Sequence, residues 1–179
     1  VIVKLWQKIY SKILILCMSV VICIASATAQ NKKSVSANSI QKEKTQQTES
    51  KKILDAIQNK KYKISVISAS PMNGKTVYLT SPYSVKISND SAYIELPYFG
   101  VAYSVPYGGG EGGIKAKNKY ENYKLRALKK GKYAVSFDIR GNEDFFKVSI
   151  DMWPSSGRAY IHVQPNNKQG ISYNGNIVL

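Results

Sequence analysis

The chain has 179 residues, a formal net charge of +15 and two cysteines. Both cysteines, Cys17 and Cys23, lie in an apolar N-terminal segment that is expected to be removed, which excludes disulfides, thiolate nucleophiles and Cys-ligated zinc from the mature protein. The fold must therefore be stabilised by a packed core, and no cofactor is expected.

The first 29 residues have the pattern of a secretory signal peptide. Three lysines precede an apolar run at residues 13–24, and Ala27-Thr28-Ala29 forms a small-residue cleavage site. The apolar run is shorter than the about 20 residues that a spanning helix needs. We expect an exported protein of the periplasm or cell envelope, cleaved before Gln30, with a retained anchor as the alternative. Neither cysteine follows a small residue, so no lipobox is expected.

Residues 30–52 are polar and lack periodicity, which predicts a disordered tether. A short helix is expected next, capped by Thr48 or Ser50. The apolar residues on one side of this helix are Ile53, Leu54 and Ile57. The folded part is then a single domain over residues 53–179, which is long enough for one hydrophobic core.

From Tyr62 onward, apolar and polar residues alternate with a period of two, which is typical of strands with one buried face. Turn residues such as Asn73-Gly74 and Lys130-Gly131 separate these segments. Eight to ten strands are expected, some formed by merging neighbouring segments, and the candidates include 101–105, 114–117 and 120–128. The pattern predicts an all-β antiparallel meander that forms a small barrel or a strongly curved sheet.

Basic residues fall on the polar phase of these strands, which predicts a basic outer wall. They are Lys86, Lys115, Lys117, Lys124, Arg126, Lys132, Arg140, Lys147 and Arg158. Export argues against nucleic acid as a partner, so anionic lipids, lipopolysaccharide or acidic glycans of the envelope are the expected counter-charges. A coat of charge that only keeps the protein soluble is the alternative.

The segment ELPYFGVAYSVPYGGGEGG at residues 95–113 combines aromatic residues with prolines and glycines. Its aromatic residues are Tyr98, Phe99, Tyr103 and Tyr107. They could cap an open barrel end, or they could contact a ligand, because tyrosine pairs an apolar ring with a polar tip. Trp153 follows a strand and is expected at a barrel rim, either as the edge of the core or as a stacking platform for a sugar or lipid.

This segment and its surroundings resemble domain of unknown function family 4251, a family of exported proteins from Bacteroides-type bacteria. The resemblance covers residues from about Tyr62 to the C-terminus. It is carried by PMNG at 71–74, LTS at 79–81, LPYFG at 96–100, AY at 102–103, PYGG at 106–109, ENY at 121–123 and ISYNG at 171–175. It implies a lipocalin-like barrel and export, and it implies no activity.

Candidate catalytic residues are few. His162 is the sole histidine and is expected on the wet face of a strand. Glu111 alone supplies too few ligands for calcium, and GGGEGG lacks the lysine of a phosphate loop. The carboxylates that could act in glycoside hydrolysis are Asp138, Glu143, Asp144 and Asp151.

Three functions follow from these patterns. The first is a non-enzymatic exported module that binds a small amphipathic molecule or a glycan at the barrel mouth. Its binding residues would be Tyr98, Phe99, Tyr103, Tyr107 and Trp153. The second is a structural protein with a filled barrel whose basic wall contacts anionic envelope polymers. The third, ranked last, is a hydrolase that uses the acidic residues.

Overall fold

A computed structural model describes residues 42, 45–101, 103, 113–142 and 144–179. The chain divides into two compact units, Val1–Thr45 and Gln46–Leu179, and everything below concerns the second. A helix over residues 45–58, of which all but the first residue belongs to this unit, is followed by strands. The strands are β1 (Lys61–Pro71), β2 (Val77–Tyr78), β3 (Ser84–Ser88), β4 (Ser91–Leu96), β5 (Ile114–Ala127), β6 (Tyr133–Arg140), β7 (Phe145–Trp153), β8 (Arg158–Pro165) and β9 (Ile171–Val178).

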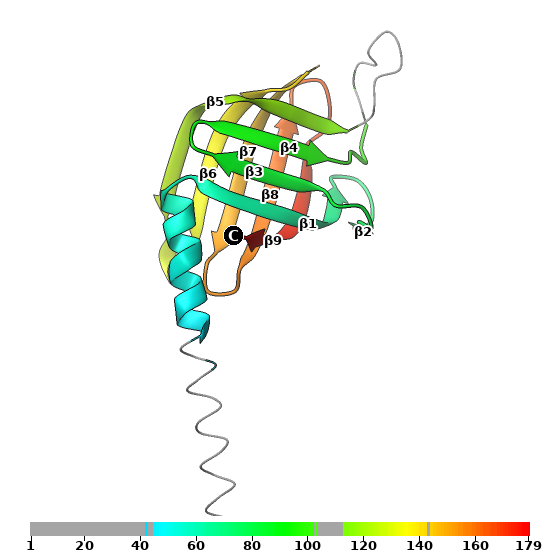
Figure 1. The fold of residues 1–179 in the computed structure, drawn as a ribbon. Coiled ribbons are helices and arrows are strands. Elements are labelled where there is room, and N and C mark those ends of the chain that lie inside the picture. Colours follow the sequence, from blue (N-terminus) through cyan, green and yellow to red (C-terminus); the bar gives the residue numbers. More distant parts are fainter. Residues whose placement is uncertain (1–41, 43–44, 102, 104–112, 143) are drawn as a thin grey trace, which may run out of the picture. The chain divides into compact units, whose positions relative to one another are not determined.

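The strands form an antiparallel barrel (Figure 1). Each strand from β3 to β8 pairs with the next one along the chain, and β1 closes the ring by pairing with both β3 and β9. The short β2 is an extra strand that pairs with β1. Closure leaves few free edges, as expected for a meander of this length. The predicted all-β barrel with a short N-terminal helix is confirmed.

The segments predicted at 114–117 and 120–128 form one strand, β5. Its first half pairs with β4 and its second half with β6, with a register shift between Glu121 and Lys124. Val101 and Tyr103 are not in a strand, and the other three residues of the predicted strand at 101–105 lie outside the described residues. The 14-residue β5 therefore serves both halves of the barrel.

The barrel interior is filled by inward-facing side chains. Val85, Val135 and Ile150 belong to a single hydrophobic cluster and are 0–1 % exposed. Side chains around a cavity large enough for water would expose surface to it, and these do not. The alternation of apolar residues thus places them in a shared core, and the interior around them is packed.

The helix packs onto this core through Ile53 and Ile57, which are both buried. It begins earlier than expected, so residues 45–52, assigned above to the tether, are helical. Ser50 does not cap it, because its hydroxyl donates to the Gln46 carbonyl one turn earlier. Among the described residues, no helix is long and apolar enough to cross a membrane.

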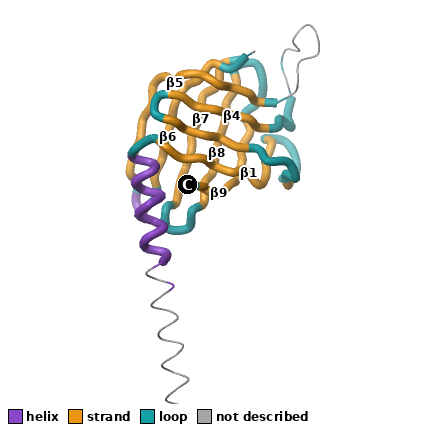
Figure 2. The backbone as a smooth tube through the Cα atoms, in the orientation of Figure 1, coloured by secondary structure: helices purple, strands orange, loops and turns teal. Residues whose placement is uncertain are grey.

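The barrel has two distinct ends, whose loops are teal in Figure 2. We call the end with the β3–β4 and β7–β8 turns the helix end, because the helix enters β1 there and Ile53 lies beside Gly157. The opposite loop end carries the β4–β5, β6–β7 and β8–β9 connections.

Candidate functional site

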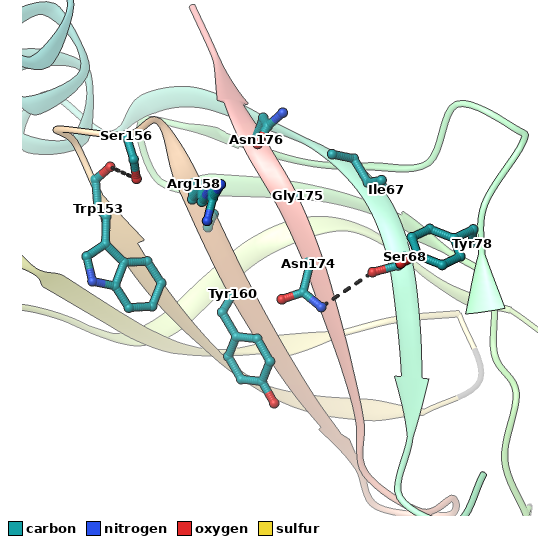
Figure 3. Close-up of a pocket in the computed structure, with 11 residues that line it drawn as sticks. Ile67, Ser68, Tyr78, Trp153, Ser156, Arg158, Tyr160, Asn174, Gly175 and Asn176 are labelled. Atoms are coloured by element: carbon teal, nitrogen blue, oxygen red, sulfur yellow. Dashed lines mark hydrogen bonds between the residues drawn. The ribbon is translucent and has the colours of Figure 1, made fainter. Parts of the chain in front are cut away.

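A groove of about 760 Å³ lies on the outer wall of the barrel, over β1, β8 and β9 (Figure 3). Most of its residues come from the outward phase of these strands, from β2 and from the β7–β8 turn, while Ala159 and Gly175 lie on the inward phase beneath them. They are Ile67, Ser68, Tyr78, Trp153, Ser156, Arg158, Ala159, Tyr160, Asn174, Gly175 and Asn176. We call this the outer groove. Its size is within the usual range of small-ligand sites.

Cross-strand register arranges these side chains in two rows. One row runs Trp153, Arg158, Asn176 across β7, β8 and β9. The other runs from Tyr160 on β8 through Asn174 and Ser68 to Tyr78 on β2. Each row thus has an aromatic residue at one end or both, with amide, hydroxyl or guanidinium groups beside it, and neighbouring strands bring them within reach of one ligand.

A β-bulge in β1 shapes one side of the outer groove. The pairing of β1 with β9 shifts register between Val66 and Ser68, so Ile67 is the extra residue. Both Ile67 and Ser68 consequently border the groove. The Ser68 hydroxyl is buried there and accepts a hydrogen bond from the Asn174 amide at 3.4 Å. Bulges often redirect side chains in this way at binding sites.

Trp153 forms one wall of the outer groove, and the ammonium group of a lysine lies over its ring. The Lys132 ammonium lies 5.2 Å from the centre of the indole ring and forms a 2.8 Å ion pair with Asp151. This contact orients the ring, since an ammonium is attracted to an aromatic face. A fixed flat ring is suited to stacking on a ligand.

The charge of the outer groove is positive. Arg158 is exposed within it, and no acidic residue is among the lining residues that the structure describes. A guanidinium can hold a carboxylate, sulfate or phosphate through two parallel hydrogen bonds. With the amides of Asn174 and Asn176 alongside, the groove offers donors and acceptors for hydroxyl groups as well.

The structure separates Trp153 from the tyrosines with which it was grouped. Pro97 ends β4 at the loop end, whereas Trp153 ends β7 at the helix end. The expectation that all five predicted binding residues line one mouth is therefore wrong for Trp153. Strand order already carried this signal: three strands lie between Pro97 and Trp153, and in an antiparallel meander an odd number places the two at opposite ends.

Tyr98 and Tyr103 tie the β4–β5 connection to the β8–β9 loop. The Tyr98 hydroxyl lies 2.9 Å from the Val101 carbonyl and 3.0 Å from that of Gln169, and can donate to either. The Tyr103 amide donates to the Asn167 carbonyl. Phe99 and the Tyr103 ring are exposed beside this junction. Tyr107 lies outside the described residues.

The candidate catalytic residues that the structure describes contact neighbouring residues. Asp138 accepts a 2.8 Å hydrogen bond from Asn122, and Asp151 pairs with Lys132. His162 Nδ1 lies 3.0 Å from the Ser172 hydroxyl. Glu143 and Glu111 lie outside the described residues. No group of three His, Cys, Asp or Glu side chains that could hold a metal occurs in the part of the chain that the structure describes.

Asp144 links two loops at the loop end. Its carboxylate accepts hydrogen bonds from the backbone amides of Phe145, Asn166 and Asn167 at 2.7, 3.3 and 3.1 Å. These bonds join the β6–β7 turn to the β8–β9 loop. The side chain thus satisfies backbone donors that would otherwise depend on solvent.

We expect Asp144→Ala to lower the free energy of unfolding by about 2 kcal/mol, because hydrogen bonds to a charged group are lost. Urea denaturation measures this. Asp138→Ala is the control, with an expected change below about 0.5 kcal/mol, since it removes a single contact to a surface amide. Equal losses in both variants would contradict a special role of Asp144.

The protein is an antiparallel β-barrel with a filled interior and a groove on its outer wall. The model of the family described as domain of unknown function (DUF4251) matches residues 44–177. The chain belongs to this family, and the match begins at the N-terminal helix. No functionally curated protein gives a significant match.

A crystal structure of a DUF4251 family protein from Bacteroides eggerthii is similar to this chain. The two are 18 % identical, with a TM-score of 0.57, and the alignment covers 73 % of this chain and 87 % of the other. At this identity the likeness supports the shared fold.

Proposed function

We propose that this protein is an exported, non-enzymatic binding module that holds an acidic glycan in the outer groove. The observation that carries the proposal is the composition of this groove: Trp153, Tyr160 and Tyr78 border a floor with Arg158 and two asparagines. Flat aromatic rings suit the apolar faces of sugars, and the amides and the guanidinium suit hydroxyl and acid groups.

The filled interior supports the outer wall as the place of binding. A ligand at the barrel mouth would need space between inward-facing side chains, and the core side chains are packed. The proposal joins a glycan ligand with the basic outer wall expected from the sequence. The secretory pattern of the first 29 residues supports a location where such glycans occur.

The test uses tryptophan emission, because Trp6 and Trp153 are the two tryptophans of the chain. A Trp6→Phe background leaves Trp153 as the sole reporter. A galacturonate dimer is expected to shift its emission, and Tyr160→Ala and Arg158→Gln should each weaken binding about tenfold, or about 1.4 kcal/mol. Methyl esterification of the sugar acids should weaken binding by the native chain and not by Arg158→Gln.

Tyr93→Ala is the matched control, because Tyr93 is an exposed tyrosine on β4 outside the outer groove. It should leave the affinity unchanged. The absence of any emission change on adding the dimer, or an equal loss of affinity in Tyr93→Ala, would overturn the proposal.

A further inference from the structure

A second hollow, of about 290 Å³, lies on the outer wall over β5 to β8. We call it the side hollow. Its residues are Asn122, Lys124, Ser136, Phe137, Asp138, Lys147, Val148, Ser149, His162 and Gln164. Its lining includes the short side chains of two serines, Ser136 and Ser149, and the longer side chains of Lys124 and Lys147. Its shape is set by strand patterning, because small residues from neighbouring strands fall in one row.

That row follows from register. Lys124 pairs with Ser136, Ser136 with Ser149, and Ser149 with His162. The imidazole is held in turn by its contact with the Ser172 hydroxyl on β9. The hydroxyls, the imidazole and the Lys124 ammonium therefore face the same strip of solvent and present hydrogen-bonding groups to one ligand.

The net charge of the side hollow is positive. Asp138 is its acidic residue; it lies opposite Lys147 in the register of β6 and β7, and its carboxylate accepts a hydrogen bond from Asn122. Lys124 has no such carboxylate opposite it, since its cross-strand partner is Ser136. An anion would therefore find a free ammonium beside serine hydroxyls, as it finds Arg158 in the outer groove.

Strand β8 contributes residues to both sites. Tyr160 borders the outer groove and His162 the side hollow, and these are consecutive outward residues about 7 Å apart. Lys147 pairs with Gln164, six residues along β8 from Arg158, so the two cations stand about 20 Å apart along the sheet. A ligand with one acid group cannot reach both.

We infer that the two sites form one continuous binding strip along β8, which takes a polymer with repeated acid groups. This inference rests on the proposed function and extends it. The acid groups of one end pair with Arg158, and those further along pair with Lys124 and Lys147. The serine row and His162 hydrogen-bond the sugar hydroxyls between them. The binding unit is then an oligomer of several acidic sugars.

Length dependence tests the strip. In the Trp6→Phe background, a galacturonate hexamer should bind about tenfold more tightly than the dimer. Lys124→Gln/Lys147→Gln should reduce hexamer affinity to near that of the dimer while leaving dimer affinity unchanged. The control is Lys86→Gln/Lys117→Gln, which removes the same charge from exposed positions on β3 and the first half of β5. It should change hexamer affinity less than twofold at physiological ionic strength.

The outcomes separate the two proposals. Dimer and hexamer of equal affinity, or equal losses in both lysine pairs, overturn the strip and leave the outer groove intact. No binding of either oligomer overturns the proposed function and the strip together. Circular dichroism of each variant checks that the barrel is unchanged.

Discussion

Raising the pH from about 10 to about 12 is expected to lower the free energy of unfolding by about 5 kcal/mol, mainly through two buried tyrosines. Burial raises the pKa of Tyr173 and, together with the neighbouring Tyr123 hydroxyl, raises the pKa of Tyr62 well above the usual 10. Burial also raises the pKa of Tyr120 to about 12, with smaller effects from Tyr123 and Asp90.

The sign of this effect follows from proton counts. Below pH 10 these hydroxyls are protonated in both states, so the stability they contribute is fully present. Above pH 10 the unfolded chain releases their protons while the folded chain keeps them, and each buried hydroxyl lowers stability by up to about 1.4 kcal/mol per pH unit. Since typical domains have about 5–15 kcal/mol in all, a loss of this size removes a large part of the stability by pH 12, and further alkali should unfold the barrel.

Tyrosinate absorbance and circular dichroism, followed together during an alkaline titration, measure this. Exposed tyrosines should titrate first without loss of structure, and a later cooperative step should release the buried hydroxyls as the β signal disappears. Tyr62→Phe should make stability fall less steeply with pH. A smooth titration of all tyrosines near pH 10, with the fold retained, would contradict the expected burial.

Gly175→Ala should lower the free energy of unfolding by about 3 kcal/mol. Gly175 lies on the inward phase of β9, opposite Val66 of the paired strand β1, and a Cβ there would overlap the Ser65 carbonyl oxygen and lie 3.1 Å from Ile64 Cγ2. Because the obstacle is backbone, the neighbouring strand has to move, and the pairing that closes the barrel weakens.

Gly131→Ala is the matched control. Gly131 has a φ of +68° and open space around its Cα. An added Cβ therefore causes backbone strain without a steric clash, and the expected loss of stability is about 1 kcal/mol. Urea denaturation of both variants compares the two effects. A loss in Gly175→Ala no larger than that in Gly131→Ala would show that the close approach of β1 and β9 is readily relieved.

The interior of the barrel could be predicted from alternation because burial depends mainly on which face a residue occupies. The break between the predicted segments of β5 has a local cause: Asn118 occupies an inward phase, yet it is exposed and donates to the Arg140 carbonyl. There β5 leaves β4 and turns toward β6, and Asn122 takes a φ of +55°. The polar residues that separate the two predicted segments accompany a bend within one strand.

The outer groove could not be predicted because it depends on pairing between distant strands. Trp153 was a candidate from its own position, but its neighbours Tyr78 and Asn174 follow from the register of β1, β2 and β9. The bulge at Ile67 coincides with a break in the alternation, where the apolar residues Val66 and Ile67 are adjacent, but the pattern does not identify β9 as the strand whose pairing the bulge shifts. Arg158 was expected to face solvent, which it does. Its place in a binding groove becomes clear only from the side chains that lie beside it on β7 and β9.

The pairing of β1 with β9, which closes the barrel, affects the order in which the barrel folds. Neighbouring strands form hairpins from nearby residues, but Ser68 and Asn174 meet across 106 positions of the chain. The entropy lost in bringing such distant residues together is recovered only when the last strand docks. Ring formation therefore waits for the C-terminal strand to be synthesised, and until then the edges of β1 and β8 stay bare and can pair with other chains.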